Sequence, residues 1–338
     1  MRCKRRGEIR RLAVVFACLT VSLCGQTLRK VAVIDLPGPK GQRFDYLTMD
    51  DEDGYLLSAH LGPGLLYVID VRTKTLVKAI PGVPGITGLE YVPVLRKVFT
   101  SNWGEEKIGV VDLHNMSVIK RLPTAAKPNG STYAAPYRKV YVSDTLGKAV
   151  AVVDVDKDEI VQTLRFASET GMPQYDSVAR RVYVSLRSTN QIAEIDPSTD
   201  KILGQYPVSG CEFNHGMAVD SDHHLAFLLC GKTRTMTVFA LDSHRAVAHL
   251  PLPSGADVVK FDPGLRRAYA ACSTGVIAVY QEDDAEHFRK LEDFPVQKMV
   301  HSLAVDTATH RVYAPEEQED GRPVARMVVY EAVTEKSH

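Results

Sequence analysis

Two histidines stand in the same sequence pattern, H-x-[ML]-A-V-D, at two distant points of the chain. His215 lies in CEFNHGMAVD (211–220), and His301 lies in QKMVHSLAVD (297–306). Each histidine precedes an aspartate by five residues, where the chain is about to form an apolar strand. Imidazoles placed beside carboxylates can bind a divalent metal or work as general acids and bases. What they do here depends on the elements that position them.

A strand centred on an aromatic residue recurs seven times along the chain, in runs such as RKVYVSD and RRVYVSL. The aromatic positions are Tyr55, Phe99, Tyr141, Tyr183, Phe227, Tyr269 and Tyr313. Their spacings are 44, 42, 42, 44, 42 and 44 residues. Each unit also contains an inner strand before the aromatic run, and each of the first six contains two further β-rich runs after it. Four strands in a period of this length predict a blade, and the fold class is therefore an all-β seven-bladed β-propeller with four antiparallel strands per blade.

The turns and the chain ends agree with this plan. An aspartate in the turn after the third strand is expected to accept hydrogen bonds from the backbone ahead of it. These aspartates are Asp70, Asp112, Asp154, Asp196 and Asp242. The last unit lacks an outer strand, and KVAVIDLPG at 30–38 is expected to supply it and so close the ring, which removes an exposed edge. An open solenoid is the alternative, and the single domain is expected to span residues 30–332, followed by a tail at 333–338.

Residues 1–25 differ in kind from the rest. A basic stretch, MRCKRRGEIRR, precedes the apolar run LAVVFACLTVSLC, which predicts a secretory signal peptide and a secreted or periplasmic protein. Lipidation of Cys24 is the alternative, and Leu23 disfavours it because lipoprotein signals place a small residue there. No membrane-spanning segment is expected after removal of the signal.

The charge balance disfavours one class of partner. The chain has 41 basic and 41 acidic residues, and residues 1–25 hold six of the basic and one of the acidic residues, so the remainder carries 35 minus 40, or −5. The mildly acidic net charge and the lack of clustered Lys and Arg disfavour nucleic-acid binding. The expected partner is a small molecule, a protein or another component of the cell envelope, and the expected state is a monomer.

Three cysteines remain after the signal peptide, so at most one disulfide can form within the chain. Cys211 with Cys230 and Cys230 with Cys272 are both open pairings. His223 and His224, in the turn DSDHHLA, are interpreted as solvated turn residues.

The inner strands can be aligned on their terminal aspartate or its equivalent, and the position five residues earlier then forms a ring around the mouth of the channel. Its members are Asp45, Thr87, Asn129, Gly171, His215, Asp257 and His301. Ring closure places Asp45, His215, Asp257 and His301 in one arc. These four are the candidate catalytic residues and the candidate ligands of a divalent metal, which is the possible cofactor. The alternative is that they line a wet channel and satisfy backbone groups. No H-E-x-x-H or paired C-x-x-C pattern supports a standard zinc site.

A second set of residues is expected on the same face, at the ends of the aromatic-centred strands and in the following loops. Together with Asn129, these are the candidate ligand-binding residues: His60, Asn102, Trp103, Asp144, Arg187 and Glu316. Trp103, the one tryptophan of the chain, can serve as a stacking platform or as a packed rim residue.

The repeat units RKVYVSDTLGKAVAVVDVDKDEIVQTL and RKVFTSNWGEEKIGVVDLHNMSVIKRL resemble the YVTN-type β-propeller repeat. The resemblance covers essentially all of residues 30–331. It implies seven blades and a secreted or surface-associated protein. The Asn that is typical after the repeat's central strand is present as Asn102 but replaced by Asp144 and Glu316 in other blades.

The leading functional hypothesis is a binding or interaction module that uses the channel rim or its face. The alternative is a propeller hydrolase or lyase, similar to lactonases and using the His/Asp arc, and whether the protein is an enzyme stays open. A haem-based redox role is disfavoured because the chain has no C-x-x-C-H pattern.

Overall fold

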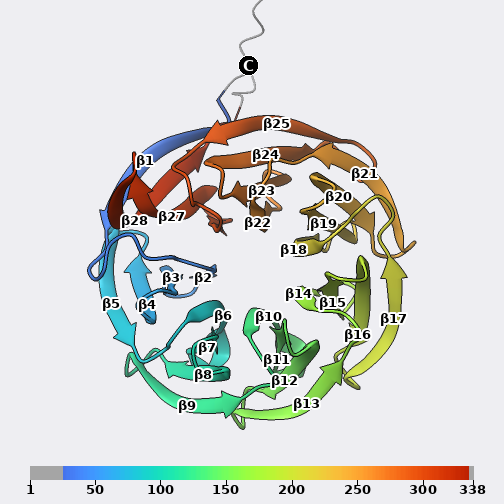
Figure 1. Ribbon diagram of the computed structural model, residues 1–338, viewed down its shortest axis with the longest axis horizontal. Helices are drawn as coiled ribbons and strands as arrows, with labels where there is room; N and C mark the ends of the chain where they lie inside the picture. The colour runs from blue at the N-terminus through green and yellow to red at the C-terminus, as the bar shows by residue number, and fades with distance from the viewer. Residues whose placement is uncertain (1–25, 335–338) are drawn as a thin grey trace, which may run out of the picture.

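The computed structural model describes residues 26–334, which form seven four-stranded antiparallel sheets arranged in a ring (Figure 1). The prediction of an all-β seven-bladed propeller is confirmed. The predicted signal peptide at 1–25 and residues 335–338 of the predicted tail lie outside the described residues. Between residues 26 and 334, no helix combines the length and the apolar character that crossing a membrane requires.

Blades 1 to 4 follow the chain from the innermost strand outward, as each sheet in Figure 1 shows. Blade 1 contains β2 (Leu47–Asp50), β3 (Tyr55–His60), β4 (Leu65–Asp70) and β5 (Thr75–Pro81). Blade 2 contains β6 (Ile86–Val92), β7 (Lys97–Asn102), β8 (Lys107–Asp112) and β9 (Ser117–Pro123), with the short 3-10 helix η1 (Pro93–Leu95) in its first turn. Blade 3 contains β10 (Pro128–Ala134), η2 (Ala135–Tyr137), β11 (Lys139–Asp144), β12 (Ala149–Asp154) and β13 (Glu159–Arg165). Blade 4 contains β14 (Thr170–Asp176), β15 (Arg181–Leu186), β16 (Gln191–Asp196) and β17 (Lys201–Pro207).

Blades 5 to 7 complete the ring. Blade 5 contains β18 (Asn214–Asp220), β19 (Leu225–Cys230), β20 (Thr235–Ala240) and β21 (Arg245–Pro251). Blade 6 contains β22 (Ala256–Asp262), β23 (Arg267–Cys272), β24 (Val276–Glu282) and β25 (Phe288–Pro295). Blade 7 contains β26 (Ala304–Asp306), β27 (Arg311–Glu319), β28 (Arg322–Ala332) and, as its outermost strand, β1 (Leu28–Asp35).

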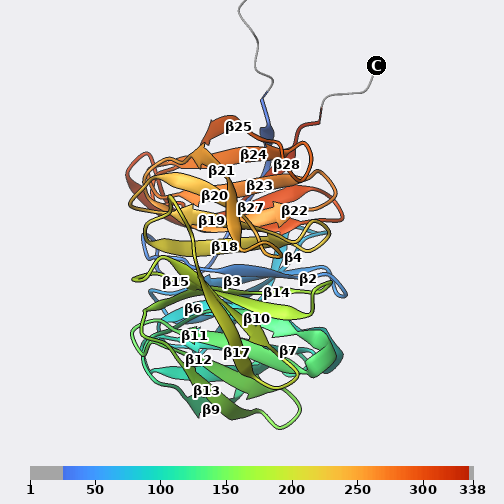
Figure 2. The ribbon, with the colours of Figure 1, turned by 90° about the vertical axis from the view of Figure 1, so that its right-hand side faces the viewer.

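The N-terminal strand closes the ring as the sequence predicts. β1 pairs antiparallel with β28, from Leu28 opposite Ala332 to Asp35 opposite Arg326. The strand begins two residues before the predicted segment and ends three residues before its end. Thr27 accepts a backbone hydrogen bond from Val333, 2.8 Å, so both ends of the described chain leave the ring side by side (Figures 1 and 2).

Apolar contacts between neighbouring blades form the core. Six of the seven repeated aromatic residues are at most 3% exposed, from Phe99 to Tyr313, while Tyr55 is half-buried. One cluster joins Phe227 of blade 5 to Ala270 of blade 6, and another joins Tyr269 of blade 6 to Val312 of blade 7. Each sheet therefore buries both faces against its neighbours, which explains the near-continuous apolar runs in the second and third strands, such as LAFLLC in β19 and AVAVVD in β12.

Aspartates close the first and third turns of the blades, and both turns lie at the same end of the sheet, as in blade 1, where Asp50 and Asp70 both pair with Tyr55. The predicted backbone hydrogen bonds are present at Asp70, Asp112, Asp154 and Asp196. The aspartates that end the inner strands make the same kind of bond, an arrangement that the sequence analysis did not anticipate; these include Asp176, Asp220, Asp262 and Asp306. The side chain replaces a backbone acceptor and fixes each turn.

One of the two open disulfide pairings is realised. Cys211 and Cys230 are bonded, with their Cα atoms 5.2 Å apart, and this bond ties the loop before β18 to the end of β19. Cys272 is a buried free thiol, and burial raises its pKa to about 12. The Cys272 thiol is therefore protonated at neutral pH and unreactive as a nucleophile.

The innermost strands are irregular at the ring positions. In blades 2 to 6 the pairing with the second strand shifts register between Ile86 and Leu89, Pro128 and Ser131, Thr170 and Pro173, Asn214 and Met217, and Ala256 and Val258. The ring residue falls inside each shift. A local bulge turns a side chain out of the regular alternation, and in this way the fold positions the side chains at the channel mouth.

Candidate functional site

A cavity of about 300 Å³ lies at the mouth of the channel, where side chains from blades 1 to 6 meet. It is lined by Arg43, Asp45, Tyr46, Trp103, Lys127, Asn129, Thr145, Leu146, Arg187, His215 and Asp257. Three side chains are basic and two are carboxylates. A second cavity of about 350 Å³ shares Arg187, His215 and Asp257 with the first and extends over blades 5 and 6 to Phe213 and Lys232.

The predicted ring is largely assembled around this cavity. Asp45, Asn129, His215 and Asp257 line it. His301 is buried, and its charge acts on Asp45. Gly171 packs against the backbone of His215, where a Cβ would come within 2.8 Å of the carbonyl oxygen. The last member, Thr87, is buried and donates its hydroxyl to the carbonyl of Pro128, 2.9 Å.

His215 and Asp257 form a pair at the wall that both cavities share. The Nε2 atom of His215 lies 3.3 Å from Oδ1 of Asp257 and 3.4 Å from the hydroxyl of Tyr46. Burial lowers the pKa of His215, while Asp257 acts in the opposite direction. The imidazole is therefore neutral at pH 7, a state in which it can accept a proton.

Arg43 occupies the space between two carboxylates of the arc. Its guanidinium is 3.7 Å from Asp45 and 3.6 Å from Asp257. Burial raises the pKa of Asp45 to about 6, with His301 as the main opposing influence. Asp45 is thus partly protonated near pH 6 and could act as a general acid.

The arc does not form a group of metal ligands in the part of the chain that the structure describes. Within residues 26–334, three or more ligand atoms of His, Cys, Asp or Glu come within 4.8 Å of one another at Asp220, His223 and Glu282, far along β18 from His215. A guanidinium cation, not a cluster of ligand atoms, lies between Asp45 and Asp257. The interposed arginine could not be predicted from the sequence, because the repeat gives the backbone position of each residue and not the reach of its side chain.

The two arginines of the cavity keep most of their hydrogen-bonding capacity. Arg187 stacks over the ring of Phe213, 4.3 Å to its centroid, and its nearest carboxylate, Glu169, is 4.0 Å away. Across residues 26–334 the side chains of Arg43 and Arg187 donate no hydrogen bond to the protein, whereas Arg326 donates to both Glu316 and Glu319. Guanidiniums that form ion pairs but donate no hydrogen bond to the protein, and that lie beside a cavity, are suited to a ligand that supplies oxygens.

Two side chains of these cavities lie in a strained backbone conformation. Lys127 and Phe213, each two residues before a ring position, have φ values of 55° and 62°. The equivalent positions in blades 2 and 6 are Gly85 and Gly255, which adopt such angles without strain. A non-glycine residue there costs about 1 kcal/mol or more. Met299 of blade 7 and turn residues such as Lys74 and Met116 adopt the same conformation, so it is a feature of the repeat and does not by itself mark the site.

Trp103 and Tyr46 supply the aromatic surface. Lys127 lies over the ring of Trp103, with Nζ 5.6 Å from its centroid, and donates to the Trp103 carbonyl, 3.3 Å. Tyr46 also lines another cavity of about 130 Å³ in the channel, which includes Glu90 and Lys260, so this residue borders both spaces. Tyr46 could have been identified from the repeat, because a large aromatic residue stands where blades 2, 3 and 5 have glycine: Gly88, Gly130 and Gly216.

The remaining predicted ligand-binding residues lie within their own blades and are not part of the cavity lining. His60 stacks on Phe44 with centroids 3.9 Å apart and contacts the Tyr67 hydroxyl at 2.9 Å, and burial lowers its pKa to about 4. Each of the others is buried and bound to a near neighbour: Asn102 to Glu105, Asp144 to Thr124, and Glu316 to Arg326. Of the proposed set, Trp103, Asn129 and Arg187 line the cavity.

Comparison with known proteins adds information on the fold. No family model and no curated protein sequence matches this chain. Similar solved structures include the mitotic checkpoint complex (11% identity, TM-score 0.77, 98% of this chain and 99% of that chain), the RRP9 WD40 repeats (11%, 0.75, 89% and 99%) and U3-55K (10%, 0.73, 90% and 98%). At these identities the likeness shows the propeller fold, and it does not single out the YVTN-type family.

Proposed function

We propose that this protein is a ligand-binding propeller that holds a small organic acid in the cavity at the channel mouth. The observation that carries the proposal is the pair of guanidiniums, Arg43 and Arg187, which line the cavity without donating a hydrogen bond to the protein in the described residues. A carboxylate can accept two parallel hydrogen bonds from one guanidinium. Lys127 adds a third positive charge to the same lining.

The acidic side chains of the cavity limit which acids fit. Asp45 and Asp257 lie within 4 Å of Arg43, so they repel a second negative charge on that side. Arg187 is farther from its carboxylate and faces the wall shared with the second cavity. We therefore expect the ligand's carboxylate at Arg187, with its uncharged part against Trp103 and Tyr46. Aromatic faces of this kind bind sugar rings and other flat groups.

We further propose that the protein acts outside the cytoplasm and belongs with the YVTN-type propellers. The basic and apolar pattern of residues 1–25 supports export. The disulfide between Cys211 and Cys230 also supports it, because such bonds persist in oxidising compartments.

Trp103 provides a direct test of ligand binding, because it is the one tryptophan of the chain and it lines the cavity. The full-length protein is titrated with the monocarboxylates galacturonate and lactate, and with the neutral compounds galactose and glycerol, while tryptophan emission is recorded. We expect a saturable change with at least one acid and none with the neutral compounds. Arg187→Leu should weaken binding by roughly tenfold or more, because a charge-assisted hydrogen bond contributes about 1.5–3 kcal/mol.

Arg72→Leu is the matched control, since Arg72 lies in the turn after β4 and its side chain is exposed. This variant should bind as the wild type does. Equal responses to the acids and their neutral analogues, or equal binding by the Arg187 and Arg72 variants, would argue against an acid-binding cavity.

A further inference from the structure

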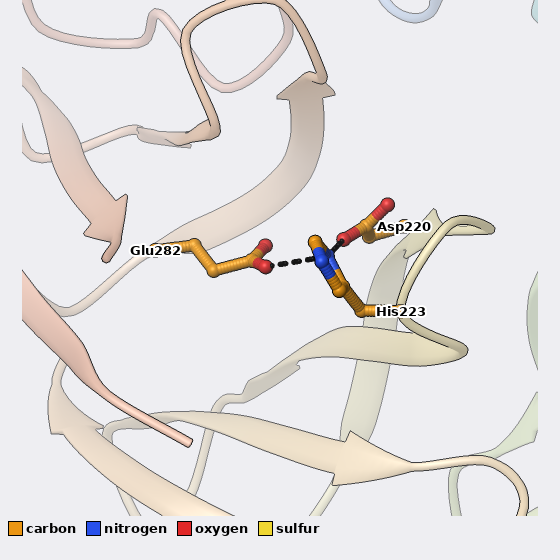
Figure 3. A group of neighbouring side chains, drawn as sticks. All are labelled: Asp220, His223 and Glu282. Atoms are coloured by element: carbon orange, nitrogen blue, oxygen red, sulfur yellow. Dashed lines mark hydrogen bonds and ion pairs between the residues drawn. The ribbon is translucent and has the colours of Figure 1, made fainter. Parts of the chain in front are cut away.

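A three-residue cluster lies at the opposite end of β18 from His215, between blades 5 and 6 (Figure 3). Asp220 ends the inner strand of blade 5, His223 lies in the turn that follows it, and Glu282 ends β24 of blade 6. The Nδ1 atom of His223 is 2.6 Å from Oδ2 of Asp220 and 2.8 Å from Oε1 of Glu282. Five residues of strand separate this cluster from the channel mouth by about 16 Å.

The hydrogen count of this cluster is incomplete. The Nδ1 atom of an imidazole carries at most one hydrogen in any protonation state. Oδ2 of Asp220 and Oε1 of Glu282 both lie at hydrogen-bonding distance from this nitrogen. If the N–H points at one of these oxygens, no hydrogen lies between the nitrogen and the other oxygen. One hydrogen shared between the two carboxylates, an extra proton on one carboxyl, or a cation bound by all three side chains would each account for this arrangement.

A second, independent observation comes from Glu282. The residue is 2% exposed, and its Oε2 atom is buried without a hydrogen-bond partner. Arg266 contacts the other oxygen, Oε1, at 2.7 Å, which compensates part of the charge and leaves Oε2 unpaired. A buried carboxylate oxygen without a partner is costly, and a bound cation would remove that cost.

The neighbouring blade junctions show a simpler arrangement. His224 of blade 5 contacts Asp176 of blade 4 at 3.1 Å, and His310 of blade 7 contacts Asp262 of blade 6 at 2.8 Å. In each of these pairs one imidazole nitrogen meets one carboxylate, so one hydrogen suffices. Only between blades 5 and 6, among the junctions that the described residues form, do two carboxylates converge on one histidine nitrogen within this distance.

We propose that Asp220, His223 and Glu282 bind a divalent transition metal, Zn²⁺ in the first instance, that ties blade 5 to blade 6. Imidazole nitrogen with carboxylate oxygens is a ligand set that Zn²⁺ accepts, whereas Ca²⁺ requires oxygen ligands throughout. The side chain of His223 is 35% exposed, so water can reach the metal and complete its coordination. The site is structural and separate from the cavity at the channel mouth.

The test uses the full-length chain after dialysis against EDTA. Zn²⁺ and Ca²⁺ are titrated separately by calorimetry, and the melting temperature is measured with and without each ion. We expect stoichiometric Zn²⁺ binding with a rise in melting temperature, and neither effect with Ca²⁺. His223→Gln should abolish both effects, and it should fold because the residue lies in a partly exposed turn.

His224→Gln is the control, because His224 is the adjacent histidine of the same turn and contacts a different blade. It should keep the Zn²⁺ response. Absence of a Zn²⁺ effect on the wild type, or equal loss of that effect in both variants, would overturn the proposal. An absent Zn²⁺ effect would mean that protons alone, shared or additional, satisfy the three side chains.

Discussion

Asp45 is the ring residue whose chemistry depends most on its position. An exposed aspartate is ionised at neutral pH, but Asp45 is buried beside the channel mouth with Asp257 nearby. Arg43 and His301 only partly offset the loss of hydration, and the pKa of Asp45 rises from 3.8 to about 6. The side chain therefore carries a proton through part of the pH range in which an exposed aspartate has released it.

This raised pKa predicts a pH-dependent cost to stability. Between pH 3.8 and about 6 the folded chain holds a proton that the unfolded chain has released, so the free energy of unfolding falls as pH rises through this range. Asp45→Asn removes the titration. The stability of the variant relative to the wild type should rise by about 3 kcal/mol between pH 3.5 and 7.5. Urea unfolding at both pH values measures it.

Asp70→Asn supplies the opposite case. Hydrogen bonds from the backbone N–H groups of Thr73 and Arg72 lower the pKa of Asp70. Its contribution to stability is therefore present above the unfolded pKa and is lost as pH falls, so the Asn variant should become relatively less stable as pH rises. A stability difference for Asp45→Asn that does not change with pH would contradict the assignment.

Residue positions on the ring could be predicted from the sequence, but contacts could not. The repeat fixes the backbone place of His215 and Asp257, and both line the cavity as expected. His60 and Glu316 were expected on the same face, yet each turns to a partner in its own blade, Tyr67 and Arg326. Which neighbour a buried polar group finds depends on tertiary packing, and a single sequence does not contain that information.

At the scale of the strands, all seven outer strands carry one extra residue. Their pairing with the third strand shifts register at one apolar position in each blade: Val31, Val77, Ile119, Val161, Leu203, Val247 and Leu291. Val77, Ile119 and Leu203 are among the exposed large apolar side chains. A bulge distorts an outer edge so that another strand cannot pair with it over its length.

Deleting Ile119 tests this role of the bulges. The deletion would let Val118 and Lys120 continue one regular ladder opposite Val111 and Val110. We expect a change of at most about 1 kcal/mol in the free energy of unfolding, since the residue is exposed. We also expect self-association that increases with protein concentration, measured by static light scattering.

The Ile119→Ala variant keeps the bulge and has less apolar surface, so it should self-associate no more than the wild type does. If the deletion variant also remains dispersed at every concentration, the bulge does not protect the edge. The bulges themselves could not be predicted from alternation along one strand. A bulge is defined by the register against a partner, and SVIKRLP reads as an ordinary strand by itself.

At the scale of the whole molecule, the ring depends on β1. The regular spacing of the aromatic residues made the number of blades predictable, and the incomplete seventh unit made the closure predictable. Leu28 and Ile34 of β1 are at most 5% exposed and pack in two different core clusters. β1 therefore contributes to the core as well as to the sheet.

Removal of residues 26–35 should destabilise the whole propeller. The deletion exposes the edge of β28 and the apolar surface that Leu28 and Ile34 cover, each of which contributes about 1.5–3 kcal/mol when fully buried. We expect a melting temperature lowered by roughly 5 °C or more. Val33→Ala, on an exposed position of the same strand, is the control and should change it little. An unchanged melting temperature of the deletion variant would show that β1 is dispensable.

The antiparallel pairing of β1 with β28 also determines how the protein responds to a pulling force. Leu28 lies opposite Ala332, so a load applied through both ends of the chain acts first on the outermost rung of one ladder. The rungs then break one after another, as in a zipper, instead of sharing the load in shear. The propeller should therefore yield at low tension, with blade 7 opening first.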